Sequence, residues 1–159
     1  MKPLPAIALI LVLLICCFPA LGEKAADVEM IESFFYSCSG ESIDAIRSYE
    51  IRKTDRGYLA DISLFAGRKR IILSMTEEEV TALAESLGDL YAWDGFSKDN
   101  PNMLDGESFH MSIAYADGST VAAWGNNAFP EGYYDIKLAI HAFFQGLMEQ
   151  YRIDEYAYE

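Results

Sequence analysis

Segment 109–124 constrains the fold of this chain more than any other part of the sequence. Its first half has large apolar residues at positions 109, 111, 113 and 115 and small or polar residues at 110, 112, 114 and 116. This period of two predicts a strand with one buried face. Asp117-Gly118 then predicts a two-residue hairpin turn, which places Trp124 opposite Met111 on the core face. This register puts two residues on the other face, Val121 and Ala123.

Four further strands are predicted in the first half of the chain. Segment 29–39 is apolar and aromatic, segment 47–65 contains two alternating arms joined by turn residues, and segment 69–75 is a short apolar run. Together with the 109–124 hairpin, they predict an antiparallel sheet of about five to six strands built from two hairpin-like units.

Two helices are predicted, one before and one after the 109–124 hairpin. The first begins at Thr76, which forms a capping box with Glu79, and ends near Gly88. The second extends over about 133–151. The residues expected to face the core are Val80, Leu83, Ala84 and Leu87 in the first helix, and Ile136, Ile140, Phe143 and Leu147 in the second. The order strands, helix, hairpin, helix predicts an α+β domain over residues 23–151, followed by an acidic tail at 152–159.

The first 22 residues have the three-part order of a secretory signal peptide. A positive start at Lys2 is followed by an uncharged run at 6–18 and by small residues before a cut after Gly22. The run is shorter than the roughly 20 apolar residues of a membrane span. We therefore expect export and an extracytoplasmic location, either secreted or at the cell surface. A lipid anchor at Cys17 is the alternative, because Leu14 lies three residues before it, although the residue before Cys17 is not the usual Gly, Ala or Ser.

Charge and cysteine content limit the classes of partner and site. The chain has 12 basic and 25 acidic residues, and removal of a leader with a single lysine leaves a net charge of −14. Such a surface repels nucleic acid and anionic membranes. Only Cys38 remains after cleavage, so the mature domain can form no internal disulfide and no Cys/His zinc cluster. Its stability must come from its hydrophobic core.

The sequence carries few signals of catalysis, so an enzyme is the least favoured class. It lacks the GxSxG, P-loop, GxGxxG and HExxH motifs, and no cofactor is expected. His141 is expected on the exposed polar stripe of the last helix, and His110 on the face of its strand away from the core. Cys38 is expected to be a small buried residue of a strand. A Cys38–His110 pair is the one catalytic arrangement left open, since such pairs meet only in space.

Segment 93–109 could be either a calcium loop or a set of turns. Its four carboxylates belong to Asp94, Asp99, Asp105 and Glu107. An EF-hand needs ligands at alternating positions, but the next two such positions after Asp99 hold a proline and a methionine. Two Asp-Gly pairs and one Asn-Pro pair are typical of turns. We therefore predict a turn-rich connection that holds no metal.

Segment 125–135 is predicted to be a recognition loop between the last strand and the last helix. Aromatic residues beside amides are typical of recognition surfaces. The expected binding residues are Asn126, Asn127, Phe129 and Tyr134. Tyr134 is expected to point outward, whereas Tyr133 falls close to the buried stripe of the helix. The alternative is structural: the asparagines cap the strand and the turn, while Phe129 and Tyr133 staple the helix.

Four short motifs lie in the second half of the chain. They are Trp-x-Gly-Phe at 93–96, Leu-Asp-Gly at 104–106, Asp-Gly at 117–118 and Gly-x-Asn-x-Phe-Pro at 125–130. Together they resemble the pattern of a family of uncharacterised secreted or lipid-anchored bacterial α+β domains. The resemblance covers about residues 91–147, and Trp124 departs from it because a small residue is expected there. It brings no known activity.

The sequence therefore favours a non-catalytic extracytoplasmic domain that binds a protein or glycan partner at the cell surface. The first alternative is an inhibitor of an extracellular protease, which would insert one of the two loops into the protease cleft. The two hairpin-plus-helix units resemble small secreted metalloprotease inhibitors in architecture only. The second alternative is an enzyme of a type without recognisable motifs.

Overall fold

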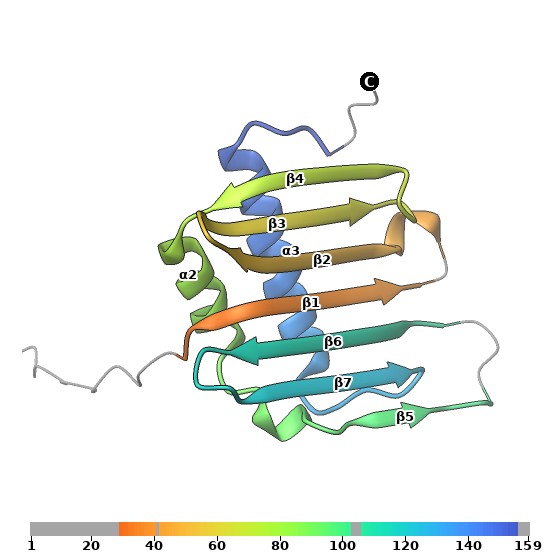
Figure 1. Ribbon diagram of the computed structural model, residues 1–159. Coiled ribbons are helices and arrows are strands. Elements are labelled where there is room, and N and C mark those ends of the chain that lie inside the picture. The colour runs from red at the N-terminus through yellow and green to blue at the C-terminus, as the bar shows by residue number, and fades with distance from the viewer. Residues whose placement is uncertain (1–28, 41, 103–105, 156–159) are drawn as a thin grey trace, which may run out of the picture.

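Seven strands form one sheet, and two helices cover one of its faces (Figure 1). The computed structural model describes residues 29–40, 42–102 and 106–155, so the predicted signal peptide, Cys17 and Asp105 lie outside the described residues. The strands are β1 (Ile31–Ser39), β2 (Arg47–Thr54), β3 (Gly57–Leu64), β4 (Lys69–Met75), β5 (Ser97–Asp99), β6 (Ser108–Tyr115) and β7 (Thr120–Asn126). The helices are α2 (Glu77–Leu87) and α3 (Tyr133–Gln150), with short 3-10 helices η1 (Ile43–Ala45) and η2 (Tyr91–Trp93).

The strand order is β4-β3-β2-β1-β6-β7-β5, which confirms an α+β fold but adds a strand to the five or six predicted. The additional strand is β5, which lies in the stretch predicted to consist of turns. It pairs in parallel with β7, whereas the other neighbouring strands are antiparallel. Its three residues are all exposed, so no alternation signals a strand there. Backbone bonds hold this segment, such as that from the N–H of Trp124 to the carbonyl of Phe96 (2.8 Å).

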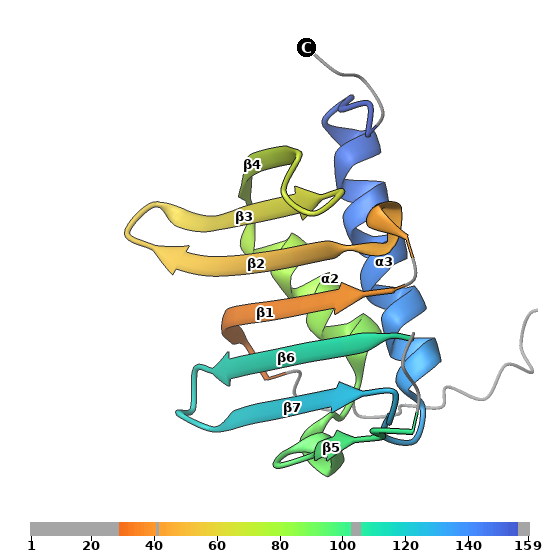
Figure 2. The same ribbon diagram turned by 90° about the vertical axis from the view of Figure 1, so that its right-hand side faces the viewer.

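The core lies between the sheet and the two helices, while the opposite face of the sheet is uncovered (Figure 2). Alternation divides each strand between these two sides. In β1, Phe34, Tyr36 and Cys38 are buried against the helices, and Ser37 lies on the uncovered face. A sheet with one packed and one solvated face is the usual outcome for antiparallel strands that alternate in this way.

The structure confirms both the capping box and the buried face predicted for helix α2. The hydroxyl of Thr76 accepts from the N–H of Glu79 (3.2 Å), and the carboxylate of Glu79 accepts from the N–H of Thr76 (2.8 Å). These two bonds satisfy backbone donors that the first turn leaves unpaired. The four residues predicted to face the core are buried: Val80, Leu83, Ala84 and Leu87.

The predicted apolar stripe of α3 packs against the core, but only two of its four residues are fully buried. Ile140 and Leu147 are buried, but Ile136 and Phe143 are only partly buried. The helix contacts α2, and its Phe144 stacks on Phe34 and Tyr49 of the sheet, so its buried face is wider than a single stripe. The fully buried residues are Tyr133, Ile140, Phe144, Leu147 and Met148.

The register predicted for the β6–β7 hairpin is wrong by one residue. The N–H of Gly118 donates to the carbonyl of Tyr115 (3.0 Å), and the N–H of Tyr115 donates to the carbonyl of Ser119 (3.0 Å), so the loop has three residues. Only Gly118 in this loop has a positive φ (89°), whereas a two-residue type I′ turn requires two such residues. Val121 and Ala123 are consequently buried, and Trp124 lies on the uncovered face with 41% of its surface exposed.

Both edges of the sheet are protected from further pairing. At one edge, the segment after α3 runs alongside β4 (Figure 1), where the hydroxyl of Tyr151 donates to the carbonyl of Ser74 (2.9 Å) and Lys69 donates to the carbonyl of Asp154. At the other edge, β5 is short and carries Lys98 and Asp99. Short, charged or covered edges prevent strand addition by other chains.

Candidate functional site

Asn127 connects the loop after β7 to the start of β6. Its N–H donates to the carbonyl of Glu107 (2.8 Å), and its side-chain Oδ1 accepts from the N–H of Glu107 (3.0 Å). The left-handed backbone at Asn127 (φ 51°) is a conformation that asparagine tolerates better than most residues. This predicted binding residue therefore holds two loops together, and its Oδ1 is already used.

Asn126, another predicted binding residue, lies on the opposite side of the sheet from the rest. Alternation along β7 places it with Trp124 on the uncovered face. Its Nδ2 donates to the Oδ1 of Asp99 on β5 (2.8 Å). The four predicted binding residues therefore do not form one cluster.

Phe129 and Tyr134 do come together, with ring centroids 5.5 Å apart. Tyr134 is 57% exposed, and Leu138, one helical turn further along α3, is 67% exposed. Residues four apart on a helix are neighbours on its surface. We name these three residues, Phe129, Tyr134 and Leu138, the apolar patch. Sequence reasoning missed Leu138, although its spacing from Tyr134 could have indicated it.

Tyr133 anchors the apolar patch to the core. Its ring is 1% exposed and stacks on Phe129 with centroids 4.5 Å apart. Its hydroxyl donates to Oε1 of Glu107 and lies 3.1 Å from the hydroxyl of Tyr36. The ammonium group of Lys137 lies 2.7 Å from the same Glu107 oxygen. This chain of polar groups fixes the first turns of α3 to β6 and β1, as predicted for Tyr133 by its place near the buried stripe.

The described carboxylates of segment 93–109 point to different partners. Asp94 accepts from the N–H of Ala122 (2.9 Å), Asp99 accepts from Asn126, and Glu107 binds Tyr133 and Lys137. Among the residues that the structure describes, no group of three His, Cys, Asp or Glu side chains could hold a metal ion. The acids of this segment therefore connect it to β7 and α3.

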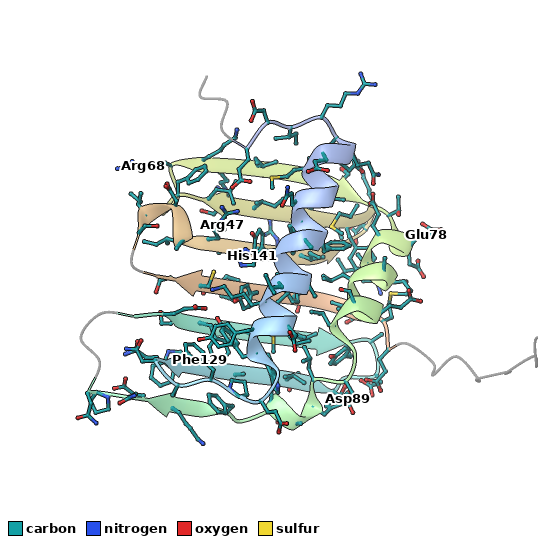
Figure 3. All side chains as sticks on the ribbon, turned by 180° about the vertical axis from the view of Figure 1, so that it is seen from behind. Arg47, Arg68, Glu78, Asp89, Phe129 and His141 are labelled. Atoms are coloured by element: carbon teal, nitrogen blue, oxygen red, sulfur yellow. The ribbon has the colours of Figure 1, made fainter. Side chains whose placement is uncertain are left out.

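The imidazole beside Cys38 belongs to His141, not to His110. His141 Nε2 lies 3.6 Å from Cys38 Sγ, and its ring is edge-on to Tyr49 with centroids 5.6 Å apart. The prediction that His141 is exposed on a polar stripe is thus wrong, because the wide buried face of α3 includes it. Figure 3 labels His141 and Arg47 on the helix-covered side of the sheet. His110 is exposed on the other face, edge-on to Phe35 at 5.5 Å.

The electrostatics of this pair favour two neutral groups. Burial raises the pKa of the Cys38 thiol, against the opposing charge of Lys137. Burial, followed by the charges of Arg47 and Lys137, lowers the pKa of His141 to about 4. A nucleophilic cysteine requires a thiolate stabilised by a nearby cation or imidazolium. The geometry instead fits a thiol–imidazole hydrogen bond that packs α3 on the sheet.

Comparisons of the chain with protein-family models, curated proteins and solved structures find no match. Over the described ranges, no helix is both long enough and apolar enough to cross a membrane. The apolar patch combines two residues of the predicted recognition loop, Phe129 and Tyr134, with Leu138 of α3, and it has a rigid support.

Proposed function

We propose that this protein is a non-catalytic extracytoplasmic domain that binds a protein partner through the apolar patch. The observation that carries the proposal is the exposure of Tyr134 and Leu138, both more than half exposed on adjacent turns of one helix. Large apolar side chains grouped on a surface are typical of protein-binding sites.

The support beneath the patch favours recognition. Phe129 stacks on Tyr133, which is itself held by Glu107 and Tyr36, so the patch is presented by groups that are already ordered. A preordered surface loses little conformational entropy on binding. Tyrosine adds a large contact area with few rotatable bonds and a hydroxyl that can bond at the rim of an interface.

The charges near the patch indicate the chemistry of the partner. Glu131 and Asp135 are exposed within one helical turn of Tyr134. The whole chain has a formal net charge of −13. A partner surface that combines an apolar centre with basic residues at its rim complements this region, and opposite charges across an interface raise the rate of association.

The binding test uses the mature domain, residues 23–159, immobilised and exposed to the extracellular and cell-surface proteins of the producing organism and to a glycan array. We expect a protein to bind with a dissociation constant that Tyr134→Ala and Leu138→Ala each raise at least about fivefold, the effect of roughly 1 kcal/mol that marks an energetic contact. Trp124→Ala, which removes an exposed aromatic from the other face, is the matched control and should leave this affinity unchanged.

Other outcomes would replace the proposal. Binding that the Tyr134 and Leu138 variants do not weaken would remove the patch from the function. Retention of a glycan alone through these residues would change the class of partner. Inhibition of an extracellular protease by the purified domain would favour the inhibitor alternative, and turnover of a substrate would favour an enzyme.

The extracytoplasmic part of the proposal rests on the N-terminal pattern alone. Mass spectrometry of the protein recovered from its host tests it directly. We expect a mature chain that begins at Glu23. A chain that begins at a lipid-modified Cys17 would establish the anchored alternative, and an uncleaved chain in the cytoplasm would contradict export.

A further inference from the structure

A row of polar side chains crosses the uncovered face of the sheet, on the side opposite the apolar patch. The strand registers place Ser63 beside Ser48, Ser48 beside Ser37, Ser37 beside His110, and His110 beside Trp124. These residues come from five consecutive strands of the sheet. Four strand spacings of about 4.8 Å make the row roughly 19 Å long. We name it the transverse row.

One end of the transverse row forms the floor of a hollow of about 500 Å³. Ser37, Ser48 and Ser63 line it together with the ring of Phe35. Its wall comes from Ile46 and from the β3–β4 turn at Ala66 and Gly67. The N–H of Ala66 donates to the carbonyl of Ile46 (3.1 Å), so the two parts of the wall are joined.

Three hydroxyl groups in the hollow are available to a ligand. Those of Ser37, Ser48 and Ser63 make no hydrogen bond to the part of the chain that the structure describes, and all three residues are half-buried. By contrast, the hydroxyls of Ser39 and Ser108, at the margin, bond to each other (2.7 Å). Each free hydroxyl can both donate and accept. A ligand that occupies the hollow therefore meets groups that can satisfy either donors or acceptors.

The floor of the hollow carries no net charge. On the same face, Arg70, the cross-strand neighbour of Ser63, binds Asp61 through bonds of 2.9 and 3.1 Å, so the two charges offset each other. Arg47, which also borders the hollow, is engaged by Glu155 at 2.8 Å. Charged ligands gain affinity from an opposite charge in the site. Arg70 and Arg47 each have a carboxylate, and the exposed Arg68, which follows Gly67 in the turn, does not line the hollow.

We infer that the hollow binds a neutral, hydroxyl-rich ring, namely one sugar unit of an uncharged oligosaccharide, and that the chain of sugars continues along the transverse row to Trp124. The serine hydroxyls bond the hydroxyls of the first unit, while Phe35 contacts its apolar face. His110 and the exposed indole of Trp124 then provide flat surfaces for the following units. A site that combines apolar and aromatic contacts with a few polar groups that fix orientation is the usual design for small ligands.

This inference does not depend on the proposed partner of the apolar patch, because the two sites lie on opposite sides of the sheet. Its test measures binding of the mature domain to an array of neutral and anionic oligosaccharides, followed by calorimetry with the neutral hexasaccharide retained most strongly. Ser48→Val fills the floor of the hollow with methyl groups and should weaken binding at least tenfold. Trp124→Ala should weaken it at least threefold.

Two controls separate this site from other effects. Ser74→Val makes the same change on the same face of the sheet, outside the hollow, and should leave affinity unchanged. Tyr134→Ala should also leave it unchanged, while it weakens the protein partner of the apolar patch. Retention of no neutral oligosaccharide, equal binding of anionic ones, or an unaltered affinity in a folded Ser48→Val variant would each overturn the inference without affecting the proposed function.

Discussion

His141 Nε2 lies 3.6 Å from Cys38 Sγ, and this contact places a partly buried imidazole between α3 and the sheet. Burial and two nearby cations lower the pKa of His141 from 6.5 to about 4. Below pH 6.5, the unfolded chain binds a proton at this residue that the folded chain does not bind. Stability is therefore lost as the pH falls from about 6.5 to about 4, and this contribution does not change further below that range.

We expect this titration to remove about 2 kcal/mol between pH 7.5 and pH 4.5, after allowance for the partial exposure of the ring. Urea unfolding at a series of pH values measures it. The loss attributable to histidine should disappear in His141→Gln and persist in His110→Gln, which alters the only other histidine of the chain. An identical pH profile in His141→Gln and the wild type would contradict the assignment.

Tyr133 and Tyr134 are adjacent, and the structure predicts that the same substitution has a large effect on stability at Tyr133 and a small one at Tyr134. Tyr133→Phe removes a buried hydroxyl that bonds Glu107 and Tyr36, which should lower the free energy of unfolding by about 1–3 kcal/mol. Tyr134→Phe should change it by less than about 0.5 kcal/mol, because that ring is largely exposed. Chemical denaturation of both variants provides the comparison. A loss of stability in Tyr134→Phe would assign this tyrosine to the packing of the helix.

Two glycines near the β6–β7 hairpin should respond differently to alanine. A Cβ at Gly125 would lie 2.1 Å from the carbonyl oxygen of Ala128 and 2.6 Å from the ring of Phe109, so Gly125→Ala should cost about 3 kcal/mol or more. A Cβ at Gly118 meets no atom within 4 Å, and Gly118→Ala should cost only about 1–2 kcal/mol for its positive φ. Thermal unfolding should rank Gly125→Ala as the most destabilised. Gly118→Asn should retain most of the stability, since asparagine tolerates this conformation, and a loss as large as that of Gly125→Ala would exclude the three-residue loop.

Calcium should have little effect on stability. The carboxylates of Asp94, Asp99 and Glu107 bond to different protein groups, so a cation would have to displace existing contacts. Occupancy of a true site at 100 times its dissociation constant would add about 2.7 kcal/mol and raise the melting temperature by several degrees. We expect no such rise when millimolar calcium is added to the chelated protein. A rise that Asp99→Asn abolishes would show that segment 93–109 is a metal loop.

Sequence patterns predict correctly those elements that depend on residues close together in the chain. The capping box at Thr76 and Glu79 depends on residues three apart, and the structure confirms it. The β6–β7 turn shows the limit of such signals, because Asp117-Gly118 suits both a two-residue turn and the three-residue loop that forms. The longer loop turns every residue of β7 to the opposite face of the sheet from the one that the two-residue turn predicts. The two-residue turn therefore predicts Trp124 in the core.

The candidate sites depend on contacts between distant parts of the chain, and sequence spacing could not predict them. Tyr134 was predicted to be exposed because its place on α3 is local, and it is exposed. The partner of Cys38 is 103 positions away on a helix that packs against two elements at once. Similarly, Ser63, Ser48 and Ser37 become neighbours only through strand pairing, so no motif links them.

The position of β1 at the centre of the sheet has a consequence for the order of folding. The chain makes β1 first, and β2 can pair with one of its edges soon afterwards, but the partner for the other edge is β6. Ser39 and Tyr115 are 76 positions apart, so this edge can be paired only after the intervening chain has become available for folding. Until then the four-stranded half of the sheet has an unpaired edge at Phe34 and Tyr36. A chaperone that holds this edge until β6 pairs with it would therefore raise the yield of folded protein.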